Sequence, residues 1–151
     1  MAAQSLADRL RAAMNEARKQ RDQARTLLLS TILSDIKNRE IELNHAPSDD
    51  ETAEVLRRGI KKRRESVEVY ERVGRTEAAG TETAEIKALE AFLPAAMSPE
   101  EIRAAVREAI AGGAKDMGKV MGAVIPQFKG RADGKLVNQI VREELAASNK
   151  S

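Results

Sequence analysis

Cysteine is absent from this chain of 151 residues, and histidine occurs once, at His45. The absence of cysteine excludes disulfides, a thiolate nucleophile and cysteine-ligated zinc. A single histidine cannot build a multi-histidine metal site, nor a Ser-His-Asp triad without help from another chain. We therefore expect no catalytic residues, no metal site, no cofactor and no intrinsic enzyme activity.

Aromatic residues are scarce as well. They make up 2% of the chain, with Tyr70, Phe92 and Phe128 and no tryptophan. RNA-binding sheets and OB barrels stack bases on several exposed rings, so modules of those kinds are not expected. Hydrophobic residues nevertheless reach 42%, which is enough to fill a core and argues against a disordered chain.

Long apolar runs are also missing. The longest, residues 27–33, is soon followed by Asp35 and is too short to span a bilayer. The first residues lack the apolar core of a signal peptide, and Asp8 and Glu16 argue against a mitochondrial transit peptide. We expect a cytoplasmic protein with no membrane segment.

Positive and negative charges almost balance over the whole chain, but they are unevenly distributed along the sequence. The formal net charge is +2, and residues 1–94 hold 17 basic and 17 acidic side chains. The excess is concentrated in Lys115–Arg142, where six basic side chains accompany two acidic ones. A local positive field of this kind can attract a polyanion even when the whole chain is nearly neutral.

Apolar residues recur every three or four positions along the chain, which predicts an all-α protein. No stretch of useful length alternates as a strand does, and no internal repeat is visible. Capping residues, prolines and glycines indicate where helices begin and end. The expected helices are one behind Ser5, one over about 22–44, one from 49–51 to Gly74, one over about 76–92, one between Ser98 and Gly112, one behind Asp116 and one behind Asp133.

Leu93-Pro94 is the predicted domain boundary. After Pro94 the helical segments become shorter and glycine becomes more frequent. We expect an N-terminal helical domain over residues 1–94 and a C-terminal helical domain over residues 95–151.

Arg57–Arg64 holds six basic residues in eight positions. It would serve either as a phosphate-binding or partner-docking surface, or as a solvated helix face balanced by glutamates one turn away. Six such positions surround a helix rather than line one side, which favours the solvated face. The acids at 49–51 are expected to cap a helix rather than bind a cation, and His45 is expected to be a surface residue.

The most distinctive segment is residues 117–138. Gly118 and Gly122 are four positions apart and share one helix face. Since a glycine inside a helix costs about 1 kcal/mol relative to alanine, a compensating gain is expected. That gain is either close packing against another helix or the close approach of a ligand backbone. The basic residues around the following turn and the N–H groups of the next helix would form a phosphate-contacting corner.

The run GKVMGAVIPQFKGRADGKLVNQIV closely resembles the C-terminal signature of the YqeY family. The long helix ending in NREIEL, the basic stretch before Glu65-Ser66 and the segment EIKALEAFLP are similar to that family too. The family shares a domain with the tail of the GatB subunit of the tRNA-dependent amidotransferase. The resemblance implies an N-terminal bundle of long helices followed by a small GatB-tail-like three-helix bundle.

In the amidotransferase the tail domain holds the outer corner of tRNA through its shape and phosphates. The resemblance therefore implies a non-catalytic module that binds tRNA or another structured RNA. The residues at the matching positions are Lys119, Lys129, Arg131 and Lys135, with Gly118 and Gly122 permitting close approach.

Two further functions stay open. The chain could be an accessory subunit of a glutamine-dependent amidotransferase, with amidotransferase subunits as its partners. Its link to carbon–nitrogen ligases that use glutamine as amide donor would then pass through the shared domain, because the catalytic body of GatB has no counterpart in this sequence. The other function is a protein-interaction scaffold that uses residues 57–64.

Overall fold

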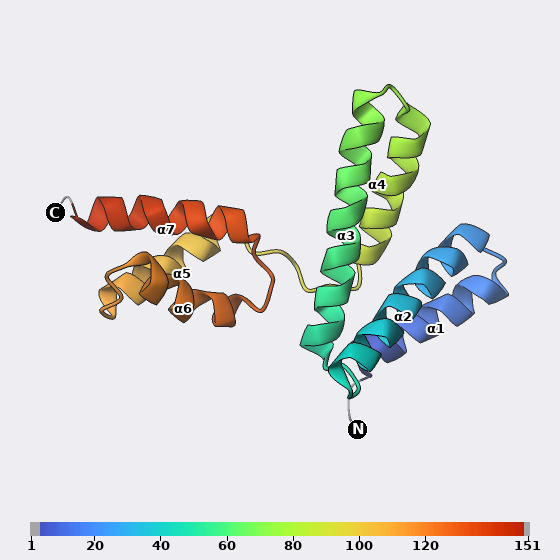
Figure 1. Cartoon of the computed structure of the whole chain (residues 1–151), viewed down its shortest axis with the longest axis horizontal. Helices are drawn as coiled ribbons and strands as arrows, with labels where there is room; N and C mark the ends of the chain where they lie inside the picture. Colours follow the sequence, from blue (N-terminus) through green and yellow to red (C-terminus); the bar gives the residue numbers. More distant parts are fainter. Residues whose placement is uncertain (1–3, 150–151) are drawn as a thin grey trace. The chain divides into compact units, whose positions relative to one another are not determined.

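The computed structural model describes residues 4–149, which form helices and no strands (Figure 1). The predicted all-α fold is confirmed. Close contacts divide the chain between Leu93 and Pro94 into two compact units. None of the described helices is long and apolar enough to cross a membrane. The helices are α1 (Leu6–Lys19), α2 (Gln23–Leu43), α3 (Asp49–Arg72), α4 (Thr76–Glu90), α5 (Pro99–Ala111), α6 (Met117–Phe128) and α7 (Gly134–Asn149).

The first unit consists of two helical hairpins, α1–α2 and α3–α4. Side-chain caps begin α1, α2 and α3, and Ser48 and Glu51 form a complete capping box at the start of α3. Asp49 accepts the Leu6 N–H at 3.0 Å and so joins the starts of α1 and α3. The predicted capping role is confirmed for Glu51, and all three acids stand in the first turn of α3. One apolar core runs through all four helices, with Leu10, Leu29, Ile32, Leu56 and Leu89 fully buried.

The two hairpins meet where α2 ends and α3 begins and then diverge, so the unit has the outline of a V (Figure 1). Gly59 of α3 lies at the close approach of the two arms. A Cβ atom at Gly59 would lie 3.1 Å from Cδ1 of Ile32 on α2, which is tighter than ordinary van der Waals contact. This buried glycine therefore leaves room for the Ile32 side chain between the middle parts of α2 and α3.

The second unit packs α5, α6 and α7 around a separate apolar core. Ser98 caps α5 as predicted, with Pro99 in the first turn, and Asp116 caps α6 as predicted. The fully buried side chains come from all three helices: Ile102, Val106, Val120, Val124, Val137, Ile140 and Val141.

Two expectations differ from the structure in detail. α4 ends at Glu90 rather than near Phe92, and the Phe92 ring lies between Arg9 and Arg25 at 5.9 and 5.8 Å from the guanidinium carbons. The three-and-four spacing of apolar residues in α7 predicts that Leu145 is buried, but it is only partly buried. Glu144 beside it is 9% exposed and belongs to the interior instead.

Candidate nucleic-acid interface

The predicted site lies on α6, on the turn after it, and at the start of α7. α6 begins behind Asp116, whose carboxylate accepts the Lys119 N–H at 2.9 Å. Val120, Val124 and Phe128 turn one face of the helix into the core. The opposite face is exposed, and α6 contains no acidic residue.

Gly118 and Gly122 lie on this exposed face. A Cβ atom at Gly122 would meet no heavy atom of the described chain within 4 Å, and one at Gly118 would meet only Oδ1 of Asp116 at 3.5 Å. Close packing against another described helix of the second unit is therefore excluded as the reason for these glycines. We call Gly118 and Gly122 the glycine face.

The helix ends in a tight turn that exposes cations. Lys129 has φ of +49°, in the left-handed region, and Gly130 follows with φ of +74°. Both Lys129 and Lys135 are exposed, and Lys135 stands in the first turn of α7. A lysine there opposes the helix dipole, so its charge does not serve helix stability. The backbone carbonyl of Asp133, the predicted cap, accepts the Val137 N–H at 3.0 Å.

Arg131 is half-buried and holds the turn in place. Its Nε–H donates to the carbonyl of Ala95 at 3.0 Å, and its own carbonyl accepts the Met97 N–H at 3.0 Å. These two bonds tie residues 95–97 to the turn. Arg131 therefore carries a structural role as well as a charge beside Lys129 and Lys135, and we call these three residues the basic corner.

The structure brings the basic corner together but leaves Lys119 apart from it. Lys119 stands in the first turn of α6, about 15 Å along the helix axis from Lys129. In the described part of the chain, no carboxylate lies within ion-pairing distance of Lys119 or of the basic corner. These four charges are available to an external anion.

Two other basic residues of the second unit, both on α5, are engaged internally. Arg103 and Arg107 of α5 donate to Glu144 of α7 at 2.7 and 2.9 Å, and Arg103 also reaches Glu143 at 2.8 Å. Hydrogen bonds from Arg107 and Arg103 lower the pKa of the Glu144 carboxyl below its ordinary value of 4.5. This cluster joins α5 to α7. Sequence reasoning missed it, although two arginines four positions apart on one helix face are a usable signal.

The cluster gives a pH-dependent prediction. The folded-state pKa of Glu144 is depressed, so its stabilisation is complete above the unfolded value of 4.5 and is lost as pH falls through the folded value. We expect Glu144→Gln to cost about 1–2 kcal/mol of unfolding free energy at neutral pH. The cost should shrink below pH 4.5, as measured by urea denaturation of wild type and variant at both pH values. An equal cost at neutral and acidic pH would contradict this account.

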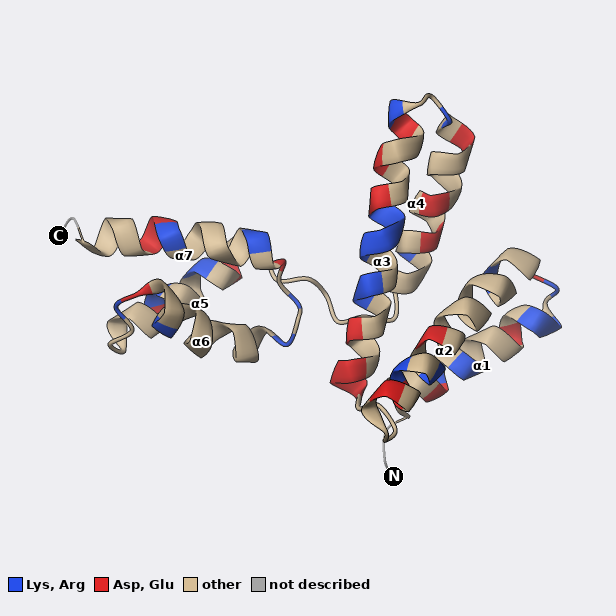
Figure 2. Cartoon of the chain, viewed as in Figure 1, with Lys and Arg blue, Asp and Glu red and all other residues tan. Residues whose placement is uncertain are grey.

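Apart from Arg57, the basic residues of this stretch of α3 (blue in Figure 2) form two groups that differ in their ion pairs. Arg63 and Arg64 bind Glu85 and Glu90 at 2.9 and 3.4 Å, and so fasten α4 to α3. Arg57 is half-buried, and burial lowers the pKa of its guanidinium. The residues of the second group are exposed and form no ion pair with a described residue; they are Arg58, Lys61 and Lys62.

The described part of the chain brings together no set of side chains suited to a metal ion. Across residues 4–149, no group of three or more His, Asp or Glu side chains could hold a metal ion. His45 is exposed, as predicted, and its Nδ1 lies 2.9 Å from the carbonyl of Ala46.

The fold and the candidate site together define an all-α protein of two helical units, the second of which exposes unpaired cations beside a bare helix face. The sequence profile of the Yqey-like proteins matches residues 7–145, so the chain belongs to the YqeY family. The family resemblance of the sequence is thus confirmed. No curated protein matches the chain.

Proposed function

We propose that this protein is a non-catalytic module that binds structured RNA, in the first place tRNA, through the basic corner and the glycine face. One observation carries the proposal. The turn after α6 exposes cations that form no ion pair with a described carboxylate, and the α6 face before this turn has no side chains at Gly118 and Gly122. Phosphate contacts supply most of the non-specific affinity for nucleic acids.

The geometry of the α6–α7 connection supports this proposal. The first N–H groups of a helix lack intrahelical partners and favour an anion. In α7 they lie next to Lys135 and follow the turn that carries Lys129. Pro126 has no N–H, so the carbonyl of Gly122 loses its usual helical donor and stays open to a ligand donor such as a ribose hydroxyl.

The aromatic residues support folded RNA over single strands. Phe128 is buried at 2% exposed, Phe92 lies against two arginines, and Tyr70 lies against Arg75 at 5.3 Å. None of the three therefore offers the open ring on which single-stranded bases stack. A-form helices are recognised instead by shape, phosphates and 2′-hydroxyl groups.

The resemblance of the C-terminal sequence to the GatB tail also supports an accessory role beside a glutamine-dependent amidotransferase. In that role the chain would contribute tRNA binding and the partner would contribute the chemistry.

Fluorescence anisotropy with labelled deacylated tRNA tests the proposal. We expect saturable binding at low salt that weakens as salt rises, and weaker binding of a poly(U) strand at the same salt. Absence of saturable tRNA binding even at low salt would reject direct RNA recognition.

A side chain added to the glycine face separates binding from folding. Because space around Gly122 is open and leucine favours helix over glycine, Gly122→Leu should raise stability by about 0.5–1 kcal/mol. The same change should weaken tRNA binding by about tenfold, since it blocks the close approach of the ligand. Ala146→Leu, at an exposed position near the end of α7, is the control and should bind as wild type does. Equal affinity of all three proteins would remove the glycine face from the site.

A further inference from the structure

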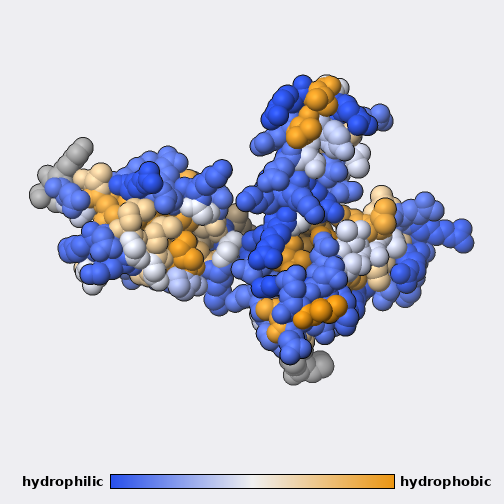
Figure 3. Space-filling model, in the orientation of Figure 1, coloured by the Kyte–Doolittle hydropathy of each residue, from blue (hydrophilic) through white to orange (hydrophobic). Residues whose placement is uncertain are grey.

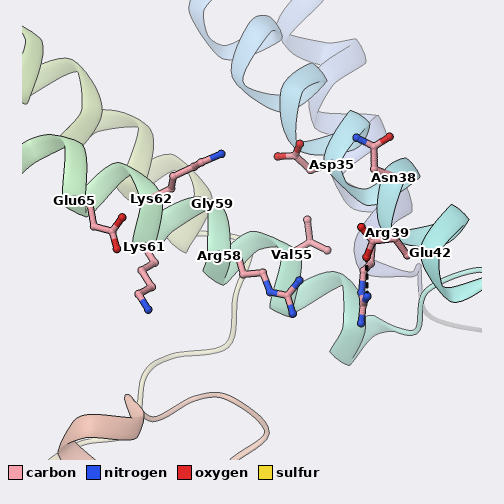
Figure 4. Close-up of a pocket in the computed structure, with 10 residues that line it drawn as sticks. All are labelled: Asp35, Asn38, Arg39, Glu42, Val55, Arg58, Gly59, Lys61, Lys62 and Glu65. Carbon is pink, nitrogen blue, oxygen red and sulfur yellow. Dashed lines mark hydrogen bonds and ion pairs between the residues drawn. The ribbon is translucent and has the colours of Figure 1, made fainter.

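A groove of about 470 Å³ opens between the arms of the first unit, lined by α2 and α3 (Figure 4). Asp35, Asn38 and Glu42 form its α2 wall, and Val55, Arg58 and Lys62 belong to its α3 wall. The floor of the groove lies where Gly59 of α3 approaches Ile32 of α2. The groove lies in the first unit and shares no residue with the basic corner or the glycine face.

The two walls differ in charge. On the α3 side, Arg58, Lys61 and Lys62 are exposed, and no described carboxylate pairs with them. Lys62 extends across the gap toward α2 (Figure 4). On the α2 side, Glu42 is neutralised by Arg39 at 2.9 Å, which leaves Asp35. The α3 wall therefore offers an excess of positive charge.

Apolar side chains continue both walls toward the open end of the V. Val55, Lys62 and Val69 are seven residues apart and share one stripe of α3, which Val73 extends by one turn. On α2, Leu27 lies eleven residues, or three helical turns, before Asn38 and therefore on the same face of the helix. Leu27, Val69 and Val73 are 70, 51 and 62% exposed. Apolar surface is visible at the end of the α3–α4 hairpin (Figure 3).

This combination fits a peptide helix better than a nucleic acid. Leucine and valine side chains offer nothing to a phosphate backbone, whereas they pack against the apolar face of a helix. An amphipathic helix, in contrast, places apolar side chains at every third or fourth position and charges along its flanks.

We propose that the groove between α2 and α3 binds an amphipathic helix of a partner protein, with acidic side chains along the flank that faces Arg58, Lys61 and Lys62. The apolar face of the partner helix covers Leu27, Val69 and Val73. This surface is a second binding site, independent of RNA binding by the other unit.

The test uses two synthetic helical peptides of about 20 residues, long enough to follow the groove. Both carry leucines along one face, and they differ only in having glutamates or lysines along the flanks. Their binding to the full chain is measured by fluorescence anisotropy. We expect the glutamate peptide to bind about tenfold more tightly than the lysine peptide.

Charge reversal provides the decisive comparison. The triple variant Arg58→Glu, Lys61→Glu, Lys62→Glu should invert the preference and bind the lysine peptide more tightly. The matched control reverses three exposed cations at the end of α1 and in the turn after it, which likewise lack described ion pairs. This variant, Arg18→Glu, Lys19→Glu, Arg21→Glu, should keep the wild-type preference. If circular dichroism shows that the groove triple is unfolded, Lys62→Glu alone should still reduce the preference. A Leu27→Ser, Val69→Ser variant should weaken both peptides.

Three results would overturn the proposal. Equal shifts in the groove and control variants would indicate a general charge effect, and equal binding of the two peptides by wild type would show no selectivity. A loss of tRNA affinity in the groove variant, absent in the control, would assign the groove to nucleic acid. Measuring tRNA binding on the same proteins also shows whether the RNA proposal stands or fails by itself.

Discussion

Replacement of Lys119, Lys129 and Lys135 together by glutamine should lower the affinity for tRNA by about 100-fold near physiological salt. The logarithm of the binding constant falls by about 0.9 per phosphate contact for each tenfold rise in salt. Losing three contacts should therefore flatten the log–log salt dependence by about two to three. The measurement is a set of anisotropy titrations of tRNA over a range of salt concentrations.

A matched variant controls for the loss of net charge. Arg18→Gln, Lys19→Gln and Arg21→Gln remove the same three charges from the exposed α1–α2 turn. The account predicts a nearly wild-type salt slope for this protein. Equal losses in both triple variants would mean that tRNA responds to the overall charge of the chain. Arg131 is left intact in both, because its bond to Ala95 would mix folding with binding.

Truncation of one fully buried aliphatic side chain should have the largest effect on stability. Leu56 of the first core and Ile140 of the second are 0 and 1% exposed. Truncation of such a residue to alanine costs about 2–5 kcal/mol, because it removes apolar contacts and leaves a cavity. We therefore expect Leu56→Ala and Ile140→Ala each to lower the free energy of unfolding by that amount.

The same pair of variants tests the proposal that residues 1–94 and 95–151 are separate domains. Amide hydrogen exchange reports the stability of each helix separately. Leu56→Ala should reduce protection in α1–α4, and Ile140→Ala should reduce it in α5–α7. A loss of protection throughout the chain in either variant would show that the two units unfold as one.

The sequence predicted those features that depend on neighbouring residues. Ser98 and Asp116 cap the helices they precede, and the three-and-four spacing of Val120 and Val124 identifies the buried face of α6. These signals are local, since a cap or an apolar face is set by residues within one or two turns.

Features that join distant segments could not be predicted in this way. The bonds of Arg103 and Arg107 to Glu144, and of Arg131 to Ala95, link residues more than thirty positions apart. Sequence reasoning also selected Gly118 and Gly122 as candidates for close packing, whereas Gly59 makes the close approach to another helix. The sequence alone does not distinguish a glycine that packs against another helix from one that faces solvent, because the difference depends on which helix lies opposite.

The central claim is that the second unit contacts tRNA through α6 and the turn after it. The most direct measurement is a titration of the ¹⁵N-labelled full chain with unlabelled deacylated tRNA, followed by amide chemical shifts and line broadening. The account predicts that the first affected amides are those of Gly118, Gly122 and Lys129–Lys135, with the α1–α2 turn unaffected. Changes confined to the first unit, or none at saturating tRNA, would contradict it.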